Sequence, residues 1–163
     1  MATLIENKTP GQIIAKYQSS SPVDVIAIAQ ELGLNVWSFS SMPEGISGKI
    51  FRDPLNGGFS GFSVGVNAHD TQRRQRFTVA HEIAHFILHK DRLESGDLVE
   101  DSLYRSGMGG QEESEANRLA ADILMPYPLI QKLASAGDKT PEALADHLAV
   151  SLAAIKIRLG LTV

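Results

Sequence analysis

Two histidines and a glutamate near the middle of the chain have the residue types and spacing of a metal site. The segment Arg76–Lys90 reads RFTVAHEIAHFILHK, in which His81, Glu82 and His85 form the pattern H-E-x-x-H. Residues four apart lie on one face of an α-helix, about one turn apart, so both imidazoles could converge on one Zn²⁺. Glu82 borders that face, where its carboxylate could act as a general base on a water at an open metal position.

The residues around this motif are almost all apolar, so the segment is expected to be a helix buried on most sides. Such a helix could instead carry two histidines and a glutamate that are satisfied by ordinary hydrogen bonds. Three ionisable groups in an apolar setting need partners that offset their desolvation, and a metal would supply them. We therefore favour the metal site.

A second helix, Glu112–Pro128 with the sequence EESEANRLAADILMPYP, could complete the site. A catalytic zinc with two histidine ligands needs one more protein ligand and an open position. Glu113 is expected to be that ligand because it points along the buried stripe of this helix, and Asn117 one turn later could orient a ligand. Glu112 and Glu115 remain alternatives, since the helix dipole also favours acidic residues here without any metal.

Other polar residues near the motif are not expected to bind the metal. His89 follows His85 by four residues, which places it about 6 Å further along the helix axis. No glycine breaks the helix to redirect this third histidine, so it is expected to pack or hydrogen-bond nearby. Arg73, Arg74 and Arg76, in the first turns of the same helix, are expected to form a solvated face rather than an anion-binding patch.

The segments around the two helices predict an α+β fold. A small, mostly antiparallel three-stranded sheet is expected from residues 35–40, 48–52 and 59–67, packed against helices, and its edge could hold an extended peptide. The central helix is expected to begin at Asp70-Thr71. Residues 91–111 are expected to form a loop beside the cleft, in which Tyr104 is a candidate hydrogen-bond donor to an oxyanion.

The C-terminal part of the chain is expected to be helical. We expect a single domain, 1–163, in which residues 1–126 form the sheet and the two helices of the metal site and 127–163 form a helical subregion. The last two helices resemble a helix-turn-helix. The second of them offers only Lys156 and Arg158 as basic groups, so a packing or protein-docking role is favoured over direct DNA binding.

Composition narrows the class of protein. The chain has 163 residues, is 43% hydrophobic and 21% charged, and contains no cysteine. It has no apolar run long enough for a membrane span and no signal-peptide pattern at its N-terminus, so a cytoplasmic protein without membrane contact is expected. The net charge of −4 argues against a protein whose main function is to bind nucleic acid.

The two motifs together resemble the ImmA/IrrE family of metallopeptidases. The resemblance rests on RFTVAHEIAHFILH followed by E-x-E-A-N-R-L-A-A-D-I-L-M-P, and extends over most of the chain; Leu119 departs from the phenylalanine frequent in the family. It implies a zinc-dependent, gluzincin-like endopeptidase that cuts a helix-turn-helix repressor of the Xre type, often encoded next door, in mobile-element or stress-response circuits. His81, His85 and Glu113 would then be the metal ligands and Glu82 the catalytic base.

Two alternatives remain from other functional classes. The protein could be a non-catalytic regulator or toxin–antitoxin component that acts by binding a repressor, or it could bind DNA through its C-terminal helices. The presence of Glu82 argues against the first alternative, because a site without turnover does not need the base.

Overall fold

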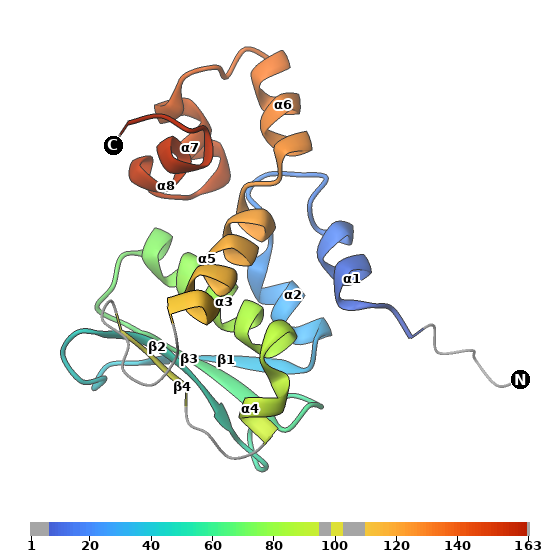
Figure 1. The fold of residues 1–163 in the computed structure, drawn as a ribbon, viewed down its shortest axis with the longest axis vertical. Helices are drawn as coiled ribbons and strands as arrows, with labels where there is room; N and C mark the ends of the chain where they lie inside the picture. Colours follow the sequence, from blue (N-terminus) through green and yellow to red (C-terminus); the bar gives the residue numbers. More distant parts are fainter. Residues whose placement is uncertain (1–6, 95–98, 103–109, 163) are drawn as a thin grey trace, which may run out of the picture.

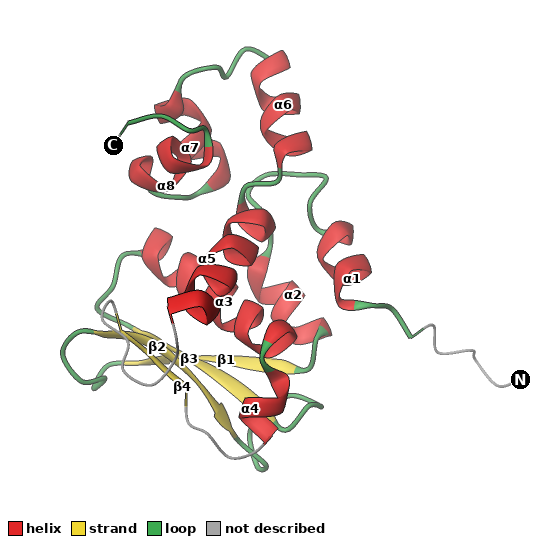
Figure 2. Ribbon diagram, in the orientation of Figure 1, coloured by secondary structure: helices red, strands yellow, loops and turns green. Residues whose placement is uncertain are grey.

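The computed structural model describes residues 7–94, 99–102 and 110–162, and within them one small sheet packs against helices (Figures 1 and 2). The helices are α1 (Pro10–Lys16), α2 (Val25–Glu31), α3 (Gln72–Leu88), α4 (Lys90–Glu94), α5 (Gly110–Leu124), α6 (Tyr127–Ser135), α7 (Pro141–Leu148) and α8 (Leu152–Arg158). The strands are β1 (Leu34–Phe39), β2 (Ile46–Arg52), β3 (Phe62–Asn67) and β4 (Val99–Ser102).

The sheet has the strand order β1-β3-β2-β4, and two of its three pairings are antiparallel while β1 and β3 are parallel. The α+β class is therefore confirmed, with a fourth strand added to the sheet. That strand and α4 lie in the segment that we predicted to be a loop, and for them the prediction is wrong. The sequence of β4, VEDS, carries no alternation of apolar and polar residues, so only its pairing with β2 identifies it as a strand. The edges of the sheet are β1 and β4.

The helices α2, α3 and α5 gather on one side of the sheet, and α3 is the element at the centre (Figure 1). It packs against β2, β3, α2 and α5. Thr71 caps its first turn by accepting a hydrogen bond from the backbone N–H of Arg74, as its position before the helix predicted. The residues Thr78 to Phe86 are all buried, so the H-E-x-x-H segment lies in the most enclosed part of the helix.

The C-terminal helices α7 and α8 are anchored by arginines of α3. Arg73 donates to the backbone carbonyl of Val150, with N–O 2.9 Å, and Arg76 donates to the carbonyls of Val23 at 2.8 Å and Ala149 at 3.3 Å. Burial lowers the pKa of Arg76 from its ordinary value, but a guanidinium remains charged. The prediction of a solvated arginine face is therefore wrong for Arg76, which is enclosed by carbonyls from distant segments, while the side chain of Arg73 is 42% exposed and also pairs with Asp146.

No helix in the described parts of the chain is both long enough and apolar enough to cross a lipid bilayer.

Gly48 in β2 sets how closely α3 approaches the sheet. A Cβ at this position would overlap Cγ2 of the buried Thr78, whose β-branched side chain has little freedom to move. We expect Gly48→Ala to lower the free energy of unfolding by about 1–3 kcal/mol, measured by urea denaturation. Gly11→Ala is the matched control: no atom lies within 4 Å of a Cβ built there, so the variant should be at least as stable as the wild type. Equal stability of Gly48→Ala and the wild type would contradict this account of the packing.

Candidate metal centre

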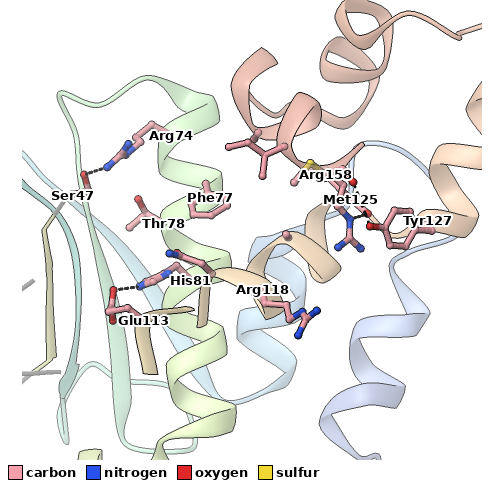
Figure 3. A pocket seen from close by; sticks show the side chains of 14 residues that line it. Ser47, Arg74, Phe77, Thr78, His81, Glu113, Arg118, Met125, Tyr127 and Arg158 are labelled. Atoms are coloured by element: carbon pink, nitrogen blue, oxygen red, sulfur yellow. Dashed lines mark hydrogen bonds and ion pairs between the residues drawn. The ribbon is translucent and has the colours of Figure 1, made fainter. Parts of the chain in front are cut away.

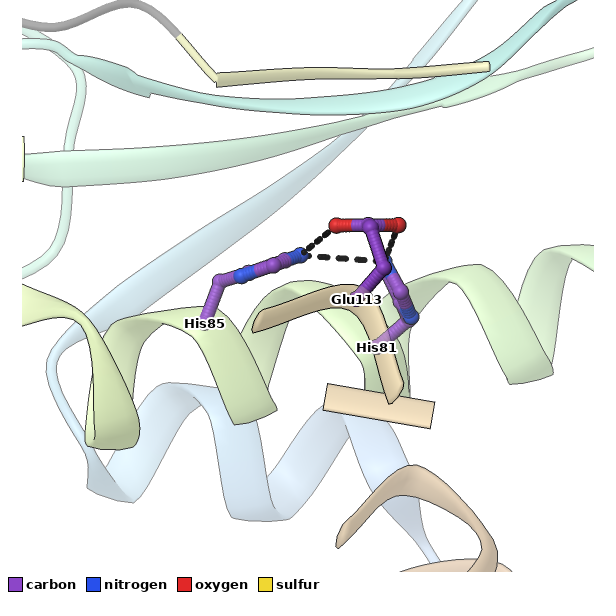
Figure 4. Close-up of side chains that lie close together, drawn as sticks. All are labelled: His81, His85 and Glu113. Carbon is purple, nitrogen blue, oxygen red and sulfur yellow. Dashed lines mark hydrogen bonds and ion pairs between the residues drawn. The ribbon is translucent and has the colours of Figure 1, made fainter. Parts of the chain in front are cut away.

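Three side chains from α3 and α5 converge on one point (Figure 4). Nε2 of His81 lies 3.1 Å from Nε2 of His85. The two carboxylate oxygens of Glu113 lie 2.9 Å from Nε2 of His85 and 3.4 Å from Nε2 of His81. One ligand atom from each of the three residues falls within 4.8 Å of the other two, so the cluster could hold a metal ion.

The donor set and its spacing fit zinc. Two ligands that are each about 2.0–2.2 Å from a tetrahedral zinc lie roughly 3.3 Å apart. The two imidazole nitrogens are close to this spacing at 3.1 Å, and each of them has one carboxylate oxygen of Glu113 at a similar distance. Two imidazole nitrogens and one carboxylate are also a common ligand set for a catalytic zinc, and they leave a fourth position open.

The packing of α5 on α3 selects one glutamate out of three. Ala116 and Ala120 are fully buried, and their small side chains allow the two helices to approach closely. Glu113 lies one turn before Ala116 and is carried into the cluster. Glu112 instead accepts two hydrogen bonds from Arg92, at 2.9 and 2.8 Å.

Glu82 has the burial expected of a residue inside the site. It lies next to His81 on α3 and is fully buried, although it is a carboxylic acid. Nε2 of His81 points into the cluster. Glu82 is the next residue on α3, so it lies on the helix turn that borders the metal position. Its role as a base remains a prediction.

A chain of hydrogen-bonding contacts leads from the cluster to the surface. Nδ1 of His85 lies 2.9 Å from Nδ1 of His89, and Nε2 of His89 lies 3.3 Å from a carboxylate oxygen of Glu115. If Glu115 accepts the proton on Nε2 of His89, then Nδ1 of His89 accepts from Nδ1–H of His85. This assignment leaves the lone pair of Nε2 of His85 directed into the cluster, as a metal ligand requires.

We therefore expect His89→Ala to weaken zinc binding by about 10–100-fold, because it removes the group that orients His85. Competition with a chromophoric chelator would measure the affinity. His147→Ala is the matched control, since this histidine is half exposed and pairs with Asp138 in the C-terminal helices. An affinity that is unchanged in His89→Ala would show that His85 needs no such support.

A cavity of about 720 Å³ opens beside the cluster and reaches the C-terminal helices (Figure 3). His81 and Glu113 form part of its wall. Asn117 also lines it, but its side chain makes no hydrogen bond within the described part of the chain, so its orienting role stays a prediction. The structure says nothing of the candidate Tyr104, which lies outside the described residues.

The remaining lining residues come from five elements and the turn between α5 and α6: Ser47, Arg74, Phe77, Thr78, Arg118, Ala121, Met125, Tyr127, Ala154, Ile157 and Arg158. Our sequence analysis assigned none of them to the site. Phe77 could have been found, because it lies four residues before His81 and so extends the same helix face. The residues of α8 carried no such signal.

The sequence of the chain matches a known protein family. A family model described as the IrrE N-terminal-like domain, of the peptidase family M78, matches residues 29–160. The chain belongs to this family. The match confirms the resemblance to ImmA/IrrE proteins and places both α3 and α5 within the shared domain of the IrrE-like family.

A solved structure gives a more distant likeness to this IrrE-like chain. It is described as a Mycobacterium tuberculosis transcriptional regulator, with 14% sequence identity and a TM-score of 0.63. The likeness covers 93% of this chain but only 46% of that protein, so the chain spans about half of the regulator's length. At this identity the comparison shows a shared fold alone. A search of curated proteins finds no significant match.

Proposed function

We propose that the protein is a zinc-dependent endopeptidase that hydrolyses a peptide bond in a protein substrate. The observation that carries this proposal is the convergence of His81, His85 and Glu113, beside a cavity and next to the buried carboxylate of Glu82. Membership of a peptidase family supports the same reaction.

In the proposed reaction, His81, His85 and Glu113 hold the metal and Glu82 handles the protons. Zinc, when bound, acts as a Lewis acid that makes a water acidic near neutral pH and polarises the scissile carbonyl. The carboxylate of Glu82 takes a proton from the attacking water and passes it to the nitrogen of the leaving amine. The hydrogen-bonded chain through His89 keeps the ring of His85 in one orientation during this exchange.

We further propose that the substrate is a helix-turn-helix repressor of the Xre type, whose cleavage relieves repression. The support is the ImmA/IrrE resemblance, together with a shared fold in a protein that is described as a transcriptional regulator. The repressor encoded by an adjacent gene is the first candidate.

Direct DNA binding by the C-terminal helices has weaker support. Of the two basic residues on α8, Arg158 already makes intramolecular contacts. Its guanidinium lies 2.8 Å from the carboxylate of Asp122 and donates to the backbone carbonyl of Met125 at 2.9 Å. Lys156 alone gives α8 little cationic surface for phosphates.

The test is incubation of the zinc-loaded protein with the purified repressor, followed by intact-mass spectrometry. We expect two fragments whose masses sum to that of the repressor plus one water, and no cleavage after the metal is removed by a chelator. A repressor that binds the zinc-loaded protein but stays intact would favour the non-catalytic regulator.

A further inference from the structure

The cavity beside the metal cluster extends from the cluster toward α8. From His81, α3 lines it backwards along the sequence through Phe77 to Arg74, whereas α5 lines it forwards from Glu113 to Ala121. Both helices therefore lead from the cluster toward α8, which contributes Ala154, Ile157 and Arg158 to the wall; Figure 3 shows Arg158 at the end of the cavity away from His81 and Glu113. We call this cavity the α8 groove.

The length of the α8 groove suits a short stretch of extended chain. The distance along α5 from Glu113 to Met125 is about 18 Å at 1.5 Å per residue. An extended peptide rises about 3.3 Å per residue, so roughly five residues fit between the cluster and α8. The groove would thus hold residues on one side of the bond that is cut at the cluster.

One part of the groove wall is apolar and accessible. Phe77 lines it one turn before His81, Ala121 lies two turns beyond Glu113, and the buried Met125 follows the end of α5. Toward α8, the accessible surface comes from Tyr127, which is 57% exposed, and Ile157, which is 67% exposed. This wall would bury an apolar side chain of a bound peptide.

The charged part of the wall is cationic. Arg118 is exposed and makes no ion pair within the part of the chain that the structure describes, and Arg74 donates one hydrogen bond, 3.2 Å long, to the hydroxyl of Ser47. Arg158, by contrast, is paired with Asp122. Among the described residues that line the wall, Glu113 alone carries a carboxylate, and the metal would neutralise it. The groove is therefore cationic in a chain whose net charge is −4.

We propose that the α8 groove selects a peptide segment in which an acidic side chain stands beside an apolar one, within about five residues of the scissile bond. The acidic side chain pairs with Arg118 or Arg74, and the apolar side chain packs between Phe77 and Ile157. This inference rests on the proposed peptidase function, since it names the substrate sequence that the site accepts.

The test measures binding without turnover. Three fluorescein-labelled decapeptides would be identical except that a central leucine is flanked by two Glu, two Gln or two Lys residues. Fluorescence anisotropy would give their affinities for the zinc-loaded Glu82→Gln protein. We expect the Glu peptide to bind roughly fivefold more tightly than the Gln peptide, and the Lys peptide to bind most weakly.

A variant with a reversed charge in the groove tests whether the arginines select the peptide. Arg118→Glu, at an exposed position of α5, should reverse the order so that the Lys peptide binds best. Lys139→Glu makes the same change in net charge at an exposed position outside the groove, and should leave the order as in the parent protein. Zinc content would show that the metal cluster is intact in both variants.

Two outcomes would overturn the inference: equal binding of the Glu and Gln peptides, or an unchanged order in both Arg118→Glu and Arg74→Glu. Failure of the peptidase proposal looks different. In that case the zinc-loaded protein with Glu82 intact would cleave neither peptides nor repressor, while the preference for the Glu peptide and its reversal would still support the groove as a binding site.

Discussion

Glu82→Gln is expected to abolish peptide hydrolysis while the metal stays bound. Glutamine has nearly the same shape as glutamate, so the buried position should tolerate it, but an amide cannot accept the proton of the attacking water. Loss of a general base of this kind costs about 10²–10⁴-fold in rate. Cleavage of the repressor would be followed by intact-mass spectrometry, with zinc content measured on the same sample.

Glu44→Gln is the matched control, because it makes the same chemical change at an exposed position on the loop before β2. It should cleave like the wild type. Full activity in Glu82→Gln would remove Glu82 from the reaction, and loss of both activity and zinc would mean that the residue supports the metal site instead.

His85→Ala and Glu113→Ala are each expected to lose the metal. The wild type, purified without a metal-affinity tag, should contain about one zinc per chain, because three protein ligands converge on one point. Removing either ligand leaves two, and the zinc content should fall by at least tenfold. Inductively coupled plasma mass spectrometry would measure the zinc content.

Two glutamates on the same helix serve as controls for Glu113. Glu112→Ala breaks the contact with Arg92 and should keep its zinc, whereas Glu115→Ala breaks the contact with His89 and should weaken zinc binding no more than His89→Ala does. Zinc that is retained by Glu113→Ala but lost from one of these variants would move the third ligand to that position. A wild type that takes up no metal, even when Zn²⁺ is added, would overturn the peptidase proposal.

The candidate site was more predictable than the fold around it. His81, Glu82 and His85 share one helix, and helix geometry alone determines that residues four apart face the same way. Glu113 lies on another helix, but its position on the buried stripe of α5 indicated that it would turn inward. Helical periodicity is a local property, so it can be read before the tertiary structure is known.

The strand at the edge of the sheet and the hydrogen-bond partners of polar residues were less predictable from the sequence. The strand β4 has no hydrophobic alternation and exists through its backbone bonds to β2. Arg73 and Arg76 stand in a run of polar residues that resembles a solvated face, yet both bind carbonyl oxygens of the turn between α7 and α8. These contacts join residues that are more than 70 positions apart in the sequence, so no local sequence pattern predicts them.

The sequence by itself determined the chemistry: a helix that presents two imidazoles on one face with a carboxylate beside them, and a second helix with a glutamate on its inner stripe. Only the tertiary structure decided that Glu113, rather than Glu112 or Glu115, reaches the imidazoles. It also decided that α8 closes a cationic groove next to them. The physical reason is that side-chain direction along a helix follows from local geometry, whereas the distance between two helices depends on how the whole core packs.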